Sequence, residues 1–403
     1  MNRVRLFVAA SVIAATLLVG AAGSNAAPFH GGLDIADIAV APDGGVAIAI
    51  RSGSPAVGMR VIRFNPDGSL DQSFGRGGQI RVRGDQIALA PDNSVVVGGS
   101  VRGRRDRADL LISRYTENGR VDRTFSGDGR VRLNSGLADF VDDMAIVRGG
   151  RIAVAAEASC FGADPGCGTT FSAARLVLLR PNGKVRRIVR PRGGTFHDVS
   201  LTPEKGLVAG LTDTGGGHLV ERFTPGGGLD PAFGDKGTVR IGSGGIRMVP
   251  PDHVAAQADG GTLVTPEDGR VQRLTPDGRL DSAFGGSGVA ACQSTQATTT
   301  AHSDIFVDSA ARIVVAGGEG DCGLARYLAN GTIDPSFSGD GHLNPVADAG
   351  TFADVMASGG AGRVLIAGWA RRAGEVRVVR LLPDGSLDPT FGTSGRAAFP
   401  VPG

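Results

Sequence analysis

The chain has 403 residues, of which 65 are glycine and only 20 are aromatic (17 Phe, 2 Tyr and 1 Trp), and 42 basic residues nearly balance 40 acidic ones. A hydrophobic content of 41% argues against wholesale disorder. Abundant glycine without a three-residue period argues against a mainly helical fold and against collagen, and a net charge of +2 gives no reason to expect a nucleic acid as partner.

The first predicted segment is a secretory signal peptide over residues 1–26. Two arginines lie within the first five residues, the apolar run Leu6–Ala22 follows, and Ser24-Asn25-Ala26 offers the small residues that signal peptidases cleave after. The apolar run is short for a membrane anchor, and no later segment reaches the length of a span. We therefore expect cleavage near Ala26 and a secreted or extracytoplasmic mature chain without a membrane span.

From residue 27 onward the chain is predicted to form short strands separated by turns. An apolar run such as Ile38–Val40 precedes a turn such as Pro42-Asp43-Gly44, and a β-branched run such as Val95–Val97 follows a turn such as Pro91-Asp92-Asn93. A third strand ends at a recurring arginine, as in Arg60–Arg63, and a fourth alternates in polarity, as in Gln79–Val82. Short apolar, β-branched runs are typical of buried strands. The last strand, Arg396–Val401, either completes the first unit or finishes the last one.

A repeated motif divides this chain into seven units. The first copy is RFNPDGSLDQSFGRGG (Arg63–Gly78), and similar copies begin at Arg114, Arg222, Arg273, Arg326 and Arg380. One copy is degenerate: in LLRPNGKVRRIVRPRG (Leu178–Gly193), the Arg, Asp and Phe positions hold Leu178, Arg186 and Val189. We therefore expect the irregular blade there. Four strands in each period of about 53 residues predict an all-β fold, a seven-bladed β-propeller of four-stranded antiparallel blades, as one domain over residues 27–403.

The motif resembles that of the delta-60 repeat family of bacterial secreted proteins. In that family the units carry an Arg-aromatic pair followed by Asp-Gly-x-Leu-Asp-x-x-Phe-Gly, and here the resemblance covers nearly all of the mature chain. It implies a propeller-like fold. It carries no established reaction and no catalytic residues that could be transferred to this sequence.

Three residue types of the motif are interpreted as structural. The arginine and the aspartate eight residues later are predicted to form a charge-assisted bond that ties the turn to the preceding strand. The phenylalanine three residues further on is predicted to fill the space between blades. The alternative is a ring of binding sites, one in each blade. The residues are Arg63, Asp71, Phe74, Arg114, Asp122, Phe125, Arg222, Asp230, Phe233, Arg273, Asp281, Phe284, Arg326, Asp334, Phe337, Arg380, Asp388 and Phe391.

Export to an oxidising compartment predicts that the four cysteines form disulfides. Cys160 and Cys167 flank a Gly/Pro-rich stretch that indicates a pinned loop, and Cys292 and Cys322 are left to pair by elimination. The spacing of the first two does not match common zinc sites.

No motif predicts catalysis, a cofactor or a bound metal. His197-Asp198 comes nearest to a general-base pair, but adjacent residues of a strand point to opposite faces. The acidic FSGDG segments Phe125–Gly129 and Phe337–Gly341 lack the glutamate that an EF-type calcium loop requires at position 12. We therefore predict no catalytic, cofactor-binding or metal-binding residues.

Loop lengths indicate where binding takes place. The motif loops are similar in length and sequence, whereas the loops on the opposite face differ in both. The variable loops include residues 101–109, 134–142, 157–173, 292–302 and 371–375. Unequal loops on a rigid scaffold commonly carry binding. One of these loops holds a candidate site for an anionic partner, or forms a solvated loop balanced by Asp106 and Asp109. Its arginines are Arg102, Arg104, Arg105 and Arg107.

The sequence thus predicts a secreted, monomeric and non-enzymatic propeller that binds or scaffolds an extracellular protein or glycan. The alternative is a propeller enzyme, such as a lyase, a lactonase or a quinone-dependent dehydrogenase, with its site at the mouth of the central channel. Converging His, Asp or Glu side chains in that channel would favour the enzyme.

Overall fold

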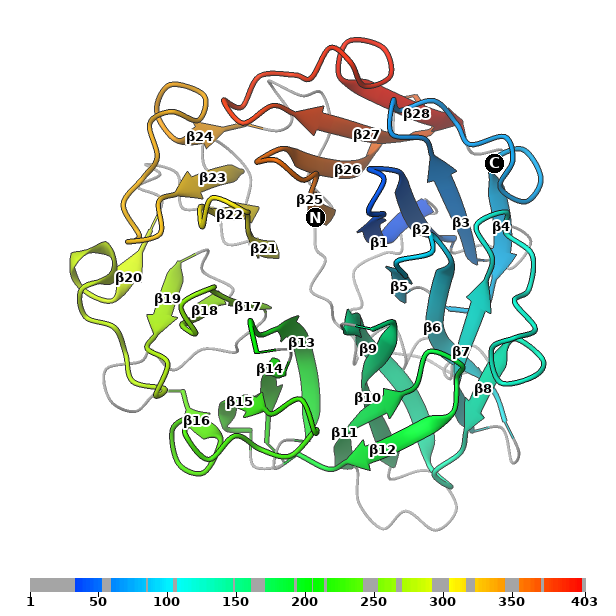
Figure 1. The fold of residues 1–403 in the computed structure, drawn as a ribbon, viewed down its shortest axis with the longest axis horizontal. Coiled ribbons are helices and arrows are strands. Elements are labelled where there is room, and N and C mark those ends of the chain that lie inside the picture. Colours follow the sequence, from blue (N-terminus) through cyan, green and yellow to red (C-terminus); the bar gives the residue numbers. More distant parts are fainter. Residues whose placement is uncertain are drawn as a thin grey trace, which may run out of the picture.

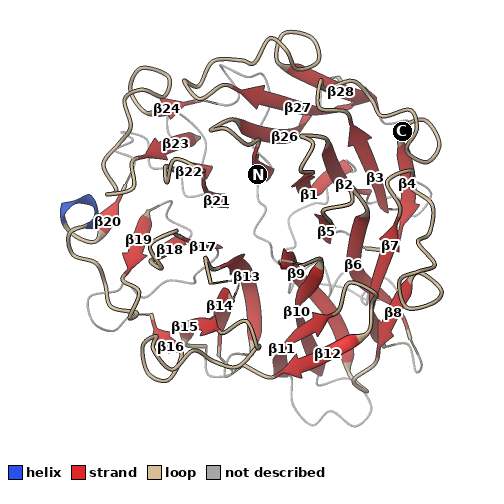
Figure 2. Ribbon diagram, viewed as in Figure 1, coloured by secondary structure: helices blue, strands red, loops and turns tan. Residues whose placement is uncertain are grey.

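The computed structural model describes residues 33–52, 59–84, 86–103, 107–147, 149–160, 171–191, 194–204, 206–213, 216–241, 253–265, 270–291, 304–316, 323–344, 355–370 and 373–400. These residues form seven four-stranded antiparallel sheets arranged in a ring (Figures 1 and 2). The predicted seven-bladed β-propeller is confirmed.

Each blade uses four strands that are consecutive in the sequence. Blades 1 to 3 comprise β1 (Leu33–Val40), β2 (Val46–Ser52), β3 (Met59–Phe64) and β4 (Gln79–Val82); β5 (Gln86–Leu89), β6 (Val95–Arg102), β7 (Ala108–Tyr115) and β8 (Arg130–Leu133); β9 (Ala138–Val147), β10 (Arg151–Cys160), β11 (Phe171–Leu179) and β12 (Val185–Val189). Blades 4 and 5 comprise β13 (Thr195–Leu201), β14 (Leu207–Thr212), β15 (His218–Phe223) and β16 (Thr238–Arg240); β17 (His253–Ala256), β18 (Thr262–Thr265), β19 (Val271–Leu274) and β20 (Val289–Ala290). Blades 6 and 7 comprise β21 (Asp304–Val307), β22 (Ile313–Ala316), β23 (Leu324–Tyr327) and β24 (His342–Leu343); β25 (Val355–Ser358), β26 (Val364–Ala370), β27 (Glu375–Leu381) and β28 (Arg396–Pro400).

The first strand of each blade lines the centre of the ring and the fourth lies at its rim (Figure 1). The last strand, β28, pairs with β27, so it finishes blade 7 and does not complete blade 1. Blades 7 and 1 meet instead by packing, with contacts between β1 and both β25 and β26. The structure thereby decides between the two alternatives that the sequence left open.

The core consists of seven apolar clusters, each of which lies between two neighbouring blades. The cluster between blades 7 and 1 contains Ile48, Val376, Phe391 and Phe399, all buried. Short β-branched strands suit this arrangement because both faces of every blade are covered by a neighbour. The six motif phenylalanines lie in these clusters with at most 1% of their surface exposed.

Blade 3 is the irregular blade. Its outer strand β12 follows the turn at Gly183 directly, so the residues that form a loop in the other blades become the strand itself. The innermost strands of blades 1, 3 and 4 also carry β-bulges, at Ala36, Asp142 and His197 respectively. A bulge leaves one residue without an opposite partner and changes the direction of its side chain.

Few features interrupt the strands. The described residues contain one short 3₁₀ turn, Phe284–Gly286, and none of their helices is long and apolar enough to cross a membrane. Cys160 is disulfide-bonded. Cys167, Cys292 and Cys322 lie outside the described residues, as does the proposed signal peptide, so the two pairings stay predictions.

Candidate functional site

The ring has two ends, which we call the motif face and the variable-loop face. The motif face carries the loops between the third and fourth strands of the blades, together with the turns between the first and second strands. In the described part of the chain, the motif arginine approaches its aspartate in all six regular blades. The Nε to Oδ2 distances are 3.4 Å for Arg63–Asp71, 3.2 Å for Arg114–Asp122, 2.8 Å for Arg222–Asp230, 2.7 Å for Arg326–Asp334 and 2.8 Å for Arg380–Asp388, and Arg273 pairs with Asp281 through Nη1.

Five of these arginines also join their own blade to the next one. Arg222 Nη1 donates to the carbonyl oxygen of Pro276, 2.7 Å away in the turn of the following blade. Equivalent bonds run from Arg63 to Glu117, Arg114 to Pro181, Arg326 to Pro383 and Arg380 to Pro66. A second bond comes from the backbone N–H that follows the motif phenylalanine, as in Gly234 N to Asp277 O at 2.9 Å. We call this pair of bonds the inter-blade latch.

The turn glycine makes room for the latch. Gly68 has φ of +80°, and a Cβ atom there would lie 2.5 Å from Gly392 N and 3.0 Å from the Phe391 ring of the preceding blade. Glycine is therefore required both for the backbone conformation and for the close approach. In four blades the arginine also stacks on its own phenylalanine, with Arg222 4.6 Å from the ring centre of Phe233. The polar groups of the motif thus form contacts with other residues of the propeller itself.

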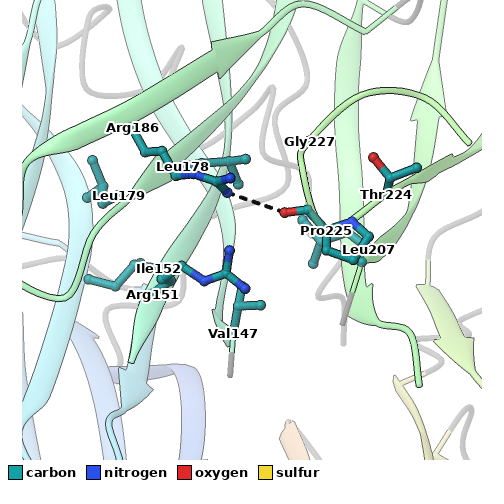
Figure 3. Close-up of a pocket in the computed structure, with 11 residues that line it drawn as sticks. Val147, Arg151, Ile152, Leu178, Leu179, Arg186, Leu207, Thr224, Pro225 and Gly227 are labelled. Atoms are coloured by element: carbon teal, nitrogen blue, oxygen red, sulfur yellow. Dashed lines mark hydrogen bonds between the residues drawn. The ribbon is translucent and has the colours of Figure 1, made fainter. Parts of the chain in front are cut away.

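Blade 3 replaces the latch with different residues. Arg186, which occupies the aspartate position, donates to Pro225 O at 3.3 Å (Figure 3). Arg187 donates to Gly226 O at 3.0 Å. These carbonyl oxygens correspond to the two latch acceptors of the other blades. Beside them lies a cavity of about 20 Å³, lined in part by Leu178 and Arg151, which has room for one water molecule but not for a larger ligand.

A second set of bonds joins the innermost strands of neighbouring blades at four interfaces, and the sequence patterns considered above did not predict it. Asp37 Oδ2 accepts a hydrogen bond from Ile87 N of the next blade at 2.8 Å. The same bond recurs from Val199 N to Asp143, from Val254 N to Asp198 and from Met356 N to Asp304. The available signal was an aspartate followed by an apolar residue at a constant place in the innermost strands.

The variable-loop end of blade 3 holds two buried carboxyl groups, Asp142 and Glu157. Burial, the charge of Glu157 and the charge of Asp143 raise the pKa of Asp142 well above its usual value. Burial likewise raises the pKa of Glu157, against the effect of a 2.9 Å hydrogen bond from Ser159. One oxygen of each carboxyl group has no hydrogen-bond partner among the described residues.

Three histidines lie near the variable-loop end of blades 4 and 5. His197 Nε2 is 2.7 Å from Thr212 Oγ1, which is 3.2 Å from His218 Nδ1. Burial lowers the pKa of His197 to about 4, with smaller effects from His218 and His253. Asp198 approaches His253 instead, with 3.6 Å between Oδ2 and Nδ1. His197 and Asp198 are adjacent in a strand that bulges at His197, and the two side chains contact different partners.

The candidate arginine loop of blade 2 is described in part. Arg102 and Arg107 are described, whereas Arg104, Arg105 and Asp106 lie outside the described residues. Arg102 and Arg107 line one pocket with Arg132, and Arg132 lines a second pocket with Arg83 and Arg130. Asp109, which we considered as a counter-charge for the loop, lies 2.6 Å from Arg132 Nε.

The acidic side chains in and beside the FSGDG segment of blade 2 bond to residues of the same blade. Asp122 pairs with Arg114 and accepts a hydrogen bond from Thr124 N, while Asp128 accepts one from Arg130 N at 3.0 Å. No group of three or more His, Cys, Asp or Glu side chains among the described residues is arranged to hold a metal ion.

A family model described as "Domain of unknown function (DUF5122) beta-propeller" matches residues 46–74, 90–125, 310–337 and 362–391, about a third of the chain. A solved structure, described as "Structure of Dos1 propeller", is 9% identical, covers 92% of each chain and has a TM-score of 0.43. No curated protein matches the sequence. The chain carries β-propeller repeats that match the model of a family whose function is not known.

Proposed function

We propose that this chain is an exported binding or scaffold module that captures an extracellular protein or glycan through its variable-loop face. The signal peptide predicted over residues 1–26 supports export, with cleavage near Ala26. The observation that carries the binding role is the different use of the two faces. In five of the six regular blades, the motif arginine bonds to a turn carbonyl of the next blade as part of the inter-blade latch, as in Arg222 with Pro276.

The variable-loop end differs from blade to blade. The polar side chains there change from Asp142 and Glu157 in blade 3 to His197 and His218 in blade 4. Arginines gather at the same end of blade 2. A scaffold that repeats its structural contacts and varies one end is the usual arrangement of a binding protein built from repeats.

We also propose that the repeats belong to the delta-60 repeat family. Each of the four stretches matched by the β-propeller family model ends at a motif phenylalanine, at Phe74, Phe125, Phe337 or Phe391. The match therefore includes the residues on which the resemblance rests. We expect the exported protein to act as a monomer, because the ring already closes on itself.

The enzyme alternative rests on the carboxyl groups and histidines of blades 3 to 5. Among them, Asp198 Oδ2 and His253 Nδ1 are 3.6 Å apart. Asp198 already holds Val254 N of the next blade, and His197 Nε2 is bonded to Thr212. Because Asp198 and His197 are engaged in these structural contacts, we rank binding above catalysis.

The experiment tethers the purified protein to beads in two orientations. A biotin-acceptor peptide is inserted after Gly216, on the variable-loop face, or after Gly339, on the motif face. A Cβ atom at either glycine would meet no atom within 4 Å, so both insertions suit the structure equally well. Beads tethered at Gly339 are expected to capture a component of a cell-envelope extract, and beads tethered at Gly216 to capture much less. Equal capture in both orientations would contradict the proposal.

A further inference from the structure

We propose that the second blade binds an acidic polysaccharide through an arginine surface along its outer edge. This proposal rests on the proposed binding function and names a site and a ligand class for it. The surface consists of Arg83, at the end of blade 1, and Arg102, Arg107, Arg130 and Arg132 of blade 2. We call it the arginine surface.

Two adjoining pockets give this surface its extended shape. The pocket at the variable-loop end is lined by Arg102, Arg107 and Arg132, together with Asp109 and Asn134. The pocket along the rim is lined by Arg83, Arg130 and Arg132, together with Asp128 and apolar atoms of the strands. Arg132 belongs to both pockets, so they form one continuous open surface rather than an enclosed cavity.

Arginine outnumbers aspartate among the described residues of the two linings. They comprise five arginines and two aspartates, Asp109 and Asp128. Asp109 is almost fully buried. It forms an ion pair with Arg132, with 2.6 Å between Oδ2 and Nε, and accepts a hydrogen bond from Asn134. The guanidinium groups of Arg83 and Arg130 are exposed and have no hydrogen-bond or ion-pair partner in the described part of the chain. These two residues are therefore available to an anion from solution.

The chemistry of the surface favours a polymer of carboxylate or sulfate groups. A guanidinium group offers paired donors that match the oxygens of either anion. A single exposed ion pair contributes only about 0–1 kcal/mol, so a ligand must repeat its charge to bind an open surface firmly. An acidic polysaccharide does so along an extended chain.

Other polyanions fit less well. Single-stranded nucleic acids bind through exposed aromatic rings, and the nearby Tyr115 is only 8% exposed. Insertion into an anionic membrane needs apolar residues beside the charges, whereas Val121 is the only large apolar side chain of blade 2 that is exposed among the described residues. The observations therefore favour the polysaccharide.

The experiment measures binding of the purified protein to immobilised polygalacturonate and dextran sulfate, and to vesicles of anionic phospholipid, with neutral dextran and neutral phospholipid vesicles as the blanks. The test variant carries Arg83→Glu and Arg130→Glu. The control carries Arg120→Glu and Arg123→Glu, which make the same charge change at exposed positions of the motif loop in the same blade. We expect at least one acidic polymer to bind, the test variant to bind about tenfold more weakly, and added salt to weaken binding further. The control is expected to bind as the parent protein does.

Three results would overturn the proposal: no binding to either acidic polymer, equal weakening by both variants, or binding confined to vesicles of anionic phospholipid. Thermal melting of both variants shows that they are folded. The bead experiment separates the two proposals. If tethering at Gly216 blocks capture from envelope extract but Arg83→Glu/Arg130→Glu does not, the binding face stands and the arginine surface fails. If neither manipulation reduces capture, the proposed function itself fails.

Discussion

The guanidinium group of Arg380 in blade 7 donates a hydrogen bond to the carbonyl oxygen of Pro66 in blade 1, across 314 residues of sequence. Beside it, Gly392 N donates to Asp67 O at 2.6 Å. Both bonds repeat the inter-blade latch that joins Arg222 to Pro276 inside the ring. Among the described residues the ring is therefore closed by one more copy of its own repeat, with each blade keeping its four consecutive strands.

The closing interface is expected to be as stable as an internal one. Arg380→Ala and Arg222→Ala each remove a 2.8 Å ion pair and one latch bond, so each should lower the free energy of unfolding by about 1–3 kcal/mol. Urea denaturation would measure both losses. A separate early transition that appears only with Arg380→Ala would show that the closing interface is the weak point.

The most buried latch should be the most sensitive to truncation. Arg326 is fully buried, pairs with Asp334 and also bonds to Ser336 and Pro383. Arg326→Ala leaves Asp334 buried without its counter-charge, and we expect a loss of about 3–5 kcal/mol in thermal or chemical unfolding. As a control, Arg279→Ala removes an exposed pair and should leave stability almost unchanged. Similar losses for both variants would contradict this account.

The replacement latch of blade 3 can be tested in the same way. Arg186→Ala combined with Arg187→Ala removes both side-chain bonds to the turn of blade 4. Because both arginines are exposed, the expected loss of stability is modest, about 1 kcal/mol. Arg123→Ala, an exposed arginine without a described partner, serves as the matched control. An unchanged melting temperature for the double variant would mean that these bonds do not support the interface.

The buried carboxyl group of Asp142 predicts a loss of stability at higher pH. Its pKa is raised in the folded state, so the folded protein binds more protons than the unfolded chain above about pH 4, and stability falls as the pH rises toward the folded pKa. Asp142→Asn removes this penalty. It should raise stability at neutral pH by about 1.4 kcal/mol for each unit of the shift and leave stability near pH 4 unchanged.

The neighbouring residue provides a control of opposite sign. Asp143 accepts a hydrogen bond from Val199 N, so Asp143→Asn is expected to destabilise the protein at neutral pH. Unfolding curves measured between pH 4 and 8 would compare the two variants. Destabilisation by Asp142→Asn at neutral pH would show that the carboxyl group is ionised and stabilising.

His197 predicts a pH dependence in the other direction. Its pKa is lowered from 6.5 to about 4, so the unfolded chain binds more protons between these values and stability falls as the pH drops through that window. The effect reaches at most about 3 kcal/mol. His197→Gln keeps a polar partner for Thr212 and should flatten the stability profile between pH 6.5 and 4. An equally steep profile in the variant would assign the acid sensitivity to other groups.

The repeat pattern alone was enough to predict the blades. The constant spacing of the motif, the Pro-Asp-Gly turns and the short β-branched runs are local signals, and they identified seven four-stranded units and the irregular third one. The spacing of eight residues between Arg63 and Asp71 also indicated their pairing, because both lie within one turn-forming segment. Local propensity and hydrogen bonding suffice for such contacts.

Contacts between blades were decided by the tertiary structure. The latch from Arg380 to Pro66, the use of Arg186 in place of a missing motif arginine and the bonds to Asp37 and Asp143 all join residues from different blades. No local pattern specifies which blade lies beside which, or which backbone carbonyl a long arginine side chain reaches. Those partners exist only once each blade has buried both faces against its neighbours, and the same packing brings Arg83 of one blade beside Arg130 of the next.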